Sequence, residues 1–167
     1  MYKVNDYVVY GLKGVCRISD IGRDEYVDSD EQFYILKPVY SSNLTIKIPV
    51  TNTTVMMRPI IRKEELPSFI AAMPKKETIW TDNEKERAAT FKTALRSGDR
   101  DEWVKIIKSV YWEKQARSLT GKKLSKTDEE IMQTAEKYLY QELAIVLNIT
   151  PDEVGSYILD HIPAAPE

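Results

Sequence analysis

Leu44-Thr45-Ile46-Lys47-Ile48-Pro49-Val50 alternates apolar and polar side chains, a period of two that is typical of a β-strand with one buried face. The alternation places three apolar side chains on one face: Leu44, Ile46 and Ile48. Lys47 lies on the other face. Because proline has no backbone N–H, Pro49 indicates a strand at the edge of a sheet or the end of a strand.

Short β-rich runs at residues 7–10, 14–18 and 33–39 precede this stretch, and turn-forming residues separate them. From residue 62 onward the apolar spacing becomes helical, and proline and glycine divide this part of the chain into several helices. The predicted fold class is therefore α+β. We expect a small β barrel over residues 1–60, followed by an all-α helical bundle over residues 61–163.

Three segments have the spacing of a capping box, in which an N-cap hydroxyl and a carboxylate three residues later each satisfy a free backbone N–H. They are Thr81-Asp82-Asn83-Glu84, Thr127-Asp128-Glu129-Glu130 and Thr150-Pro151-Asp152-Glu153. They predict helix starts at residues 81, 127 and 150. A further helix is expected from residue 99 to residue 117, with Trp103, Ile106, Ile107 and Val110 as its buried stripe.

The composition, 43% hydrophobic and 30% charged, is that of an ordinary globular protein. A single cysteine, Cys16, excludes an internal disulfide and fits a reducing compartment. No apolar run approaches the roughly 20 residues of a membrane span, and the first residues do not resemble a signal peptide. We expect a cytoplasmic protein that does not associate with membranes.

Few residues suit catalysis. The only histidine, His161, lies near the end of the chain, so no nucleophile has a histidine base nearby in the sequence. Cys16 has no second cysteine or histidine at zinc-ligand spacing. The acidic turn Asp24–Glu31, which includes Asp28, lacks the glycine and spacing of a calcium loop. We expect a binding protein without enzymatic activity, cofactor, metal or small-molecule substrate.

Charge is unevenly distributed along the chain. Residues 1–70 carry no net charge, residues 75–123 carry +5 and residues 124–167 carry −7, which together give the overall −2. A basic segment in an acidic protein favours contact with a polyanion. The alternative is that the helices of a bundle simply have unevenly charged solvated faces.

A helical projection gives the basic segment a geometry. Lys85, Lys92 and Arg96 fall within about 40° of one another on one flank of the helix that follows residue 81. Cations in a row of this kind contact phosphates without reading sequence. Arg87 projects to the other side of the apolar stripe and is a further candidate. In the next helix, Lys108 shares the face opposite the core with Trp112, and a tryptophan in such a place is more often packed against a neighbouring helix than stacked on a base.

Trp80 precedes the predicted helix start at residue 81, among cationic residues. It could pack over the helix entrance, although the partner expected for a hydrophobic staple would be Lys85, which is not apolar. It could instead wedge against a base step in a distorted minor groove. The residues alone leave both readings open.

The chain resembles the CarD/CdnL family of bacterial transcription regulators over almost its whole length. The segments that carry the resemblance are residues 2–10, 44–49, Met57-Arg58, Trp80, Ser97-Gly98-Asp99 and Lys123-Leu124-Ser125. The N-terminal part also resembles the polymerase-interacting domain of transcription-repair coupling factors.

This resemblance implies a Tudor-like β barrel that binds the β subunit of RNA polymerase by edge-strand pairing. The residues implied in that contact are Arg23, Leu44, Ile46, Lys47 and Ile48, with Arg23 the looser match. The helical part would lie on promoter DNA, with Trp80 as the wedge. We expect a monomer in the working complex.

This sequence departs from the mycobacterial type of the family in two ways. About four more residues separate Trp80 from Ser97, and Glu129 and Glu130 stand where that type has basic residues. The predicted function is a regulator that stabilises the open promoter complex by touching DNA at the upstream edge of the bubble. The alternative is a polymerase-binding adaptor whose helical part recruits another protein.

Overall fold

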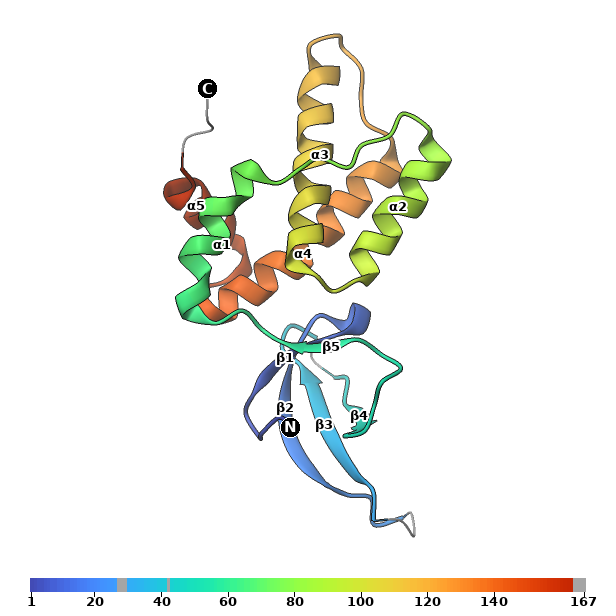
Figure 1. The fold of residues 1–167 in the computed structure, drawn as a ribbon, viewed down its shortest axis with the longest axis vertical. Helices are drawn as coiled ribbons and strands as arrows, with labels where there is room; N and C mark the ends of the chain where they lie inside the picture. Colours follow the sequence, from blue (N-terminus) through green and yellow to red (C-terminus); the bar gives the residue numbers. More distant parts are fainter. Residues whose placement is uncertain (27–29, 42, 164–167) are drawn as a thin grey trace. The chain divides into compact units, whose positions relative to one another are not determined.

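The computed structural model describes residues 1–26, 30–41 and 43–163, so Asp28 of the acidic turn lies outside the described residues. The chain forms two compact units, Met1–Ile60 and Ile61–Glu167 (Figure 1). We call them the N-terminal unit and the C-terminal unit, and each is described by itself.

The N-terminal unit is a single antiparallel sheet. Its strands in the described part of the chain are β1 (Tyr7–Tyr10), β2 (Val15–Arg23), β3 (Gln32–Pro38), β4 (Ile46–Pro49) and β5 (Met57–Pro59). A 3₁₀ turn, Gly11–Lys13, joins β1 to β2. The spatial order is β4-β3-β2-β1-β5, so β4 is an edge strand, as the alternating stretch and its proline predict.

The core of this sheet is formed by alternate residues of the strands. The buried cluster consists of Val8, Cys16, Ile18, Tyr34, Leu36 and Ile48. The register between β2 and β3 shifts between Ile18 and Asp20, a bulge that bends the strand and increases its twist. The short strand β5 was not predicted, because three residues around Arg58 carry too little pattern to identify a strand.

The C-terminal unit is helical. Its elements are the 3₁₀ turn η2 (Lys63–Glu65), α1 (Leu66–Ala72), the 3₁₀ turn η3 (Met73–Lys75), α2 (Glu84–Arg96), α3 (Arg100–Ser118), α4 (Lys126–Leu147) and α5 (Pro151–His161). A β module followed by a helical module is the predicted α+β class, and this prediction is confirmed.

The core of the helical unit includes most of the predicted stripe of α3, since Trp103, Ile106 and Val110 are at most 1% exposed, whereas Ile107 is only partly buried. The Trp103 ring packs on Tyr138 of α4, with ring centroids 5.5 Å apart. Trp112 is different, because 56% of its surface is exposed. The expectation that it packs against a neighbouring helix is wrong.

Two of the predicted helix starts are also wrong. The cap of α2 is Asn83, whose side-chain oxygen accepts a hydrogen bond from the Glu86 N–H at 3.0 Å. The cap of α4 is Ser125, whose hydroxyl accepts from the Asp128 N–H at 3.1 Å. Each segment contains several residues that can act as an N-cap, and the sequence alone does not show which of them is used. The capping box at Thr150 is confirmed.

Candidate functional site

The outer edge of β4 is the first candidate surface. β4 pairs with β3 so that Ile48 lies opposite Tyr34 and Lys47 lies opposite Ile35. The Val50 N–H donates to the Gln32 carbonyl at 3.0 Å, so Val50 and Gln32 form a hydrogen-bonded pair. In an antiparallel ladder every second pair is hydrogen-bonded, which includes the pairs of Ile48 and Ile46. Ile46 and Ile48 therefore direct their backbone groups toward β3.

The backbone groups that face away from β3 belong to the intervening residues. The N–H and C=O of Lys47 point outward, where an added strand would pair, whereas the C=O of Pro49 accepts a hydrogen bond from the Asn52 N–H at 3.0 Å. The expectation for Ile48 is corrected here, because its side chain is 4% exposed in the core and its main chain pairs with β3. Ile46 is half-buried with the same inward pairing, and Leu44, just before the strand, is 40% exposed. Sequence reasoning did not reveal that the main chain of Lys47 is the outward part of the strand, because the direction of each amide depends on the register.

Lys47 is held in place on the outer face of the sheet. Its ammonium forms an ion pair with Asp24 and lies 4.8 Å from the centre of the Phe33 ring. The hydrogen bond from Lys47 lowers the pKa of Asp24. Arg23, the looser match, is paired with Asp30 at 3.1 Å, and its side chain is 65% exposed. Both cations of the predicted docking surface are thus accessible to a partner.

The second candidate surface surrounds Trp80, which lies in the extended segment between η3 and α2. This segment crosses the face of α3 (Figure 1). It is anchored there because the Ile79 N–H donates to the Ser109 hydroxyl at 2.8 Å. Trp80 is partly exposed, although its indole N–H is buried and has no hydrogen-bond partner among the described residues.

The Trp80 ring packs on side chains of α2 and α3. The Arg87 guanidinium carbon lies 4.0 Å from the ring centre, and the Phe91 ring meets the indole edge-on at 6.2 Å between centroids. The Arg117 guanidinium lies 5.7 Å away. Since Asn83 is the N-cap, Arg87 occupies the N4 position. N4 is the position whose side chain packs on a residue before the helix in a hydrophobic staple, and Trp80 contacts Arg87 there.

Arg87 is not a surface cation, and its assignment as a DNA contact is wrong. The residue is 3% exposed and donates from Nε and Nη2 to the two carboxylate oxygens of Asp128, at 3.0 and 2.9 Å. These bonds raise the pKa of Arg87, so the charge is retained inside the unit. The helical projection gave its direction correctly but could not reveal a partner on α4.

Lys108 is also unavailable for phosphate. Its ammonium donates to the carbonyls of Pro74 and Lys76, both at 2.6 Å, and so fastens the extended segment to α3. We therefore remove Lys108 from the candidate contacts.

Lys85, Lys92 and Arg96 are all exposed along one flank of α2. At 1.5 Å rise per residue, Arg96 lies about 16 Å along the axis from Lys85, and Lys85 is at the end that carries Trp80. Three more exposed lysines follow α3 and open α4: Lys122, Lys123 and Lys126. They lie near this end of the unit because Arg117, which flanks Trp80, also donates to the Lys123 carbonyl at 3.2 Å. The charge count of residues 75–123 included Lys122 and Lys123 but not Lys126, and the spacing did not single any of them out.

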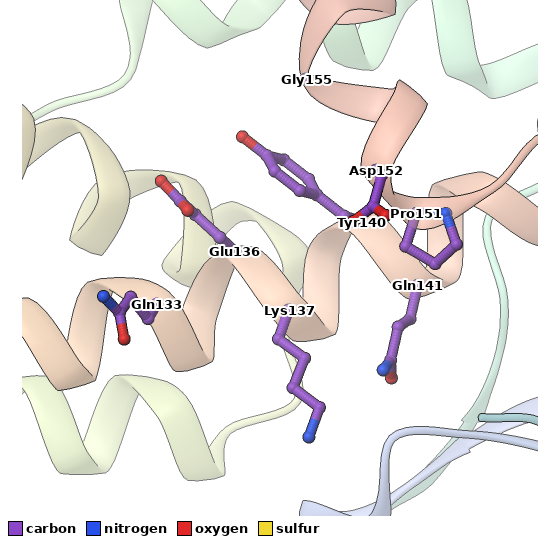
Figure 2. Close-up of a pocket in the computed structure, with 8 residues that line it drawn as sticks. All are labelled: Gln133, Glu136, Lys137, Tyr140, Gln141, Pro151, Asp152 and Gly155. Carbon is purple, nitrogen blue, oxygen red and sulfur yellow. The ribbon is translucent and has the colours of Figure 1, made fainter. Parts of the chain in front are cut away.

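A groove of about 450 Å³ lies between α4 and α5. Figure 2 shows Glu136 and Tyr140 projecting from α4 on the same side, while Lys137 and Gln141 project from the opposite side of the helix. Burial raises the pKa of both Glu136 and Tyr140. The lining is polar, unlike the enclosed and mainly apolar pockets that take small ligands.

The residues considered for catalysis lie apart from these surfaces. Burial raises the pKa of the Cys16 thiol to about 11. The His161 ring stacks on Tyr157 with centroids 4.0 Å apart. Among the described residues, no cluster of histidine, cysteine, aspartate or glutamate could hold a metal ion, and none of the helices has the length and apolarity to cross a membrane.

The two units match the two halves of one known family of transcription regulators. The family model described as "CarD-like/TRCF RID domain" matches residues 2–61, and the one described as "CarD, C-terminal domain" matches residues 69–159. The chain belongs to the CarD family, which is a family of regulators of transcription and is not known for enzymes.

Among individual proteins, the chain is similar to "Putative transcription factor YdeB" of Bacillus subtilis (strain 168). The two are 21% identical over 165 residues, which cover 94% of this chain and 99% of the relative. The similarity thus extends over both units.

Proposed function

We propose that this protein docks on the β subunit of RNA polymerase through β4 and contacts promoter DNA at the upstream edge of the bubble, where it stabilises the open complex. The observation that carries the docking half is the outer edge of β4, where the N–H and C=O of Lys47 point outward beside its accessible side chain. A strand of the β subunit would continue the sheet there, with main-chain bonds for affinity and Lys47 for specificity.

The DNA half rests on Trp80 and the flank of α2. The buried indole N–H lies outside the accessible part of Trp80, so its contact with a base step would be apolar, as a wedge requires. Arg87 packs on the ring from inside the unit. The exposed cations Lys85, Lys92 and Arg96 would contact phosphates. This arrangement is largely independent of DNA sequence.

A second candidate function is supported by the exposed aromatic pair of α3. Tyr111 and Trp112 are 53% and 56% exposed and meet edge-on, with centroids 6.2 Å apart. Exposed tryptophan and tyrosine are enriched where proteins bind one another, so this pair suits an adaptor that recruits another protein.

The test compares Trp80→Ala with its matched control, Trp112→Ala, in the lifetime of open complexes formed by purified polymerase after a competitor is added. We expect Trp80→Ala to shorten the lifetime about tenfold, equivalent to about 1.4 kcal/mol, and Trp112→Ala to have no effect. Lys47→Glu should abolish binding to the polymerase.

A lifetime that Trp80→Ala leaves unchanged, together with loss of polymerase binding in Lys47→Glu, would support the adaptor instead. Normal polymerase binding by Lys47→Glu would refute the proposed docking edge.

A further inference from the structure

The first turn of α4 reaches the Trp80 site through a chain of buried contacts. We infer that Asp128 is a positioning residue for DNA binding: it fixes Arg87, and Arg87 fixes the orientation of Trp80. The functional consequence rests on the proposed DNA contact of Trp80, whereas the positioning itself is testable without DNA.

The link between α4 and α2 is a two-point bond. Both carboxylate oxygens of Asp128 accept from Arg87, and both residues are nearly inaccessible, at 2% and 3% exposure. The Ser125 hydroxyl donates to Asp128 Oδ2 at 2.7 Å and so fixes the carboxylate from its other side. A planar guanidinium with both edges committed has a defined plane.

The link between α2 and Trp80 is made by the parts of the Arg87 guanidinium that do not bind Asp128. Its central carbon lies over the indole ring, 4.0 Å from the ring centre. Its Nη1 donates to the carbonyl of Thr81, the next residue in the chain, at 2.9 Å. Arg87 therefore holds both the ring of Trp80 and the backbone beside it.

The hydrogen bonds that hold this segment to the helices without Arg87 lie on the N-terminal side of Trp80. On the N-terminal side the Ile79 N–H is bound to Ser109. On the C-terminal side the Arg87 bond to Thr81 is the anchor before the Asn83 cap. Release of Arg87 would free Trp80 toward α2 while the anchor on α3 remained, so the loss of orientation would be local.

Asp128 acts without touching DNA. A carboxylate at a DNA surface repels phosphate, whereas Asp128 is buried and neutralised by its ion pair. Its neighbour Glu129 is the matched control, because it carries the same charge in the same helical turn and has no ion pair among those found in the described residues.

The first experiment uses ¹⁹F NMR of the full chain labelled with 5-fluorotryptophan. The three tryptophans give three resonances, assigned from Trp80→Phe and Trp112→Phe. We expect Asp128→Asn to move or broaden the Trp80 resonance and to leave that of Trp103, in the core between α3 and α4, unchanged. Glu129→Gln should leave all three unchanged.

Two further variants separate positioning from charge and from unfolding. Arg87→Lys keeps the cation but loses the flat face and the two-point bond, and it should displace the Trp80 resonance as Asp128→Asn does. The double variant Arg87→Met with Asp128→Leu replaces the buried pair by apolar side chains, a change that proteins often tolerate without loss of stability. It should fold with an unchanged Trp103 resonance and a displaced Trp80 resonance.

The second experiment measures the open-complex lifetime. Asp128→Asn should shorten it about tenfold in the wild-type background and should have no further effect in a Trp80→Ala background. An unchanged Trp80 resonance in Asp128→Asn would overturn the inference, as would an effect of equal size in both backgrounds. If Trp80→Ala itself left the lifetime unchanged, the proposed DNA contact would fail, and the NMR result alone would decide the positioning.

Discussion

The free edge of β4 leads to a sharp prediction for Lys47→Pro. The amide of Lys47 points away from β3, so proline there removes no hydrogen bond of the folded sheet. Pro49 already occupies the equivalent outward position two residues later. An edge strand tolerates proline on its solvent side. The substitution should therefore leave the fold intact and remove one donor from the docking edge.

The magnitude follows from the bond that a partner strand would lose. The carbonyl facing Lys47 in the complex would be buried without a donor, which costs about 1–3 kcal/mol. Affinity for polymerase should fall about 5- to 150-fold. Lys47→Ala is the control, because it removes the exposed ion pair with Asp24, which contributes little to stability, but keeps the amide.

The assay is fluorescence anisotropy of labelled protein titrated with core RNA polymerase, together with thermal unfolding of each variant. We expect Lys47→Pro to bind more weakly than Lys47→Ala while its melting temperature stays close to that of Lys47→Ala. Equal affinities for the two variants, with both folded, would show that no strand pairs with this edge.

Three other outcomes follow from buried or exposed charges of the C-terminal unit. Glu142→Ala should destabilise the protein by about 3–5 kcal/mol in urea unfolding, because the fully buried carboxylate is bound by Arg100 at 3.0 Å; a loss below 1 kcal/mol would contradict this. Burial would raise the pKa of Asp128, but hydrogen bonds from Arg87 and Ser125 outweigh it and hold the pKa below the usual value. The stability that the Asp128 carboxylate contributes is complete above about pH 4 and is lost as the pH falls through its folded-state pKa. The difference in urea midpoint between wild type and Asp128→Asn should therefore narrow below about pH 4. A difference that stays constant with pH would refute this linkage. For DNA binding, Lys85→Ala and Arg96→Ala should each reduce the slope of log affinity against log salt concentration by about 0.9. The control is Lys137→Ala in the α4–α5 groove, which should leave this slope unchanged.

The sequence predicted those parts of the fold that depend on local pattern. Alternation identified the strand, and Pro49 indicated a sheet edge or a strand end, because both are properties of the strand itself; the sheet order shows that β4 is at the edge. The outward direction of the Lys47 amide was not predictable, because it depends on which residue of β3 faces Ile48. That pairing is a contact between segments, and the spacing within one of them does not contain it.

The same limit explains the errors around Trp80. The projection of α2 correctly placed Arg87 away from the flank of Lys85, but its partner Asp128 is 41 residues further along the chain. Without that partner an arginine among cations is naturally assigned to the surface. The start of α2 was misplaced for a related reason: the Thr81 carbonyl is bound by Arg87, which keeps this part of the chain extended until the cap at Asn83.

Each candidate surface combines an accessible residue with a buried one that lies beside it in the structure. Ile48 is buried, and its neighbour Lys47 offers the free amide, since successive residues of a strand alternate in the direction of side chain and backbone groups. Arg87 is buried, and Trp80 is the accessible side chain that rests on it. In each case the inward residue has many native contacts and the outward one has few. Substitution of the inward residue will thus affect stability and function together, whereas substitution of Lys47 or Trp80 tests the binding surface with the least disturbance to the core.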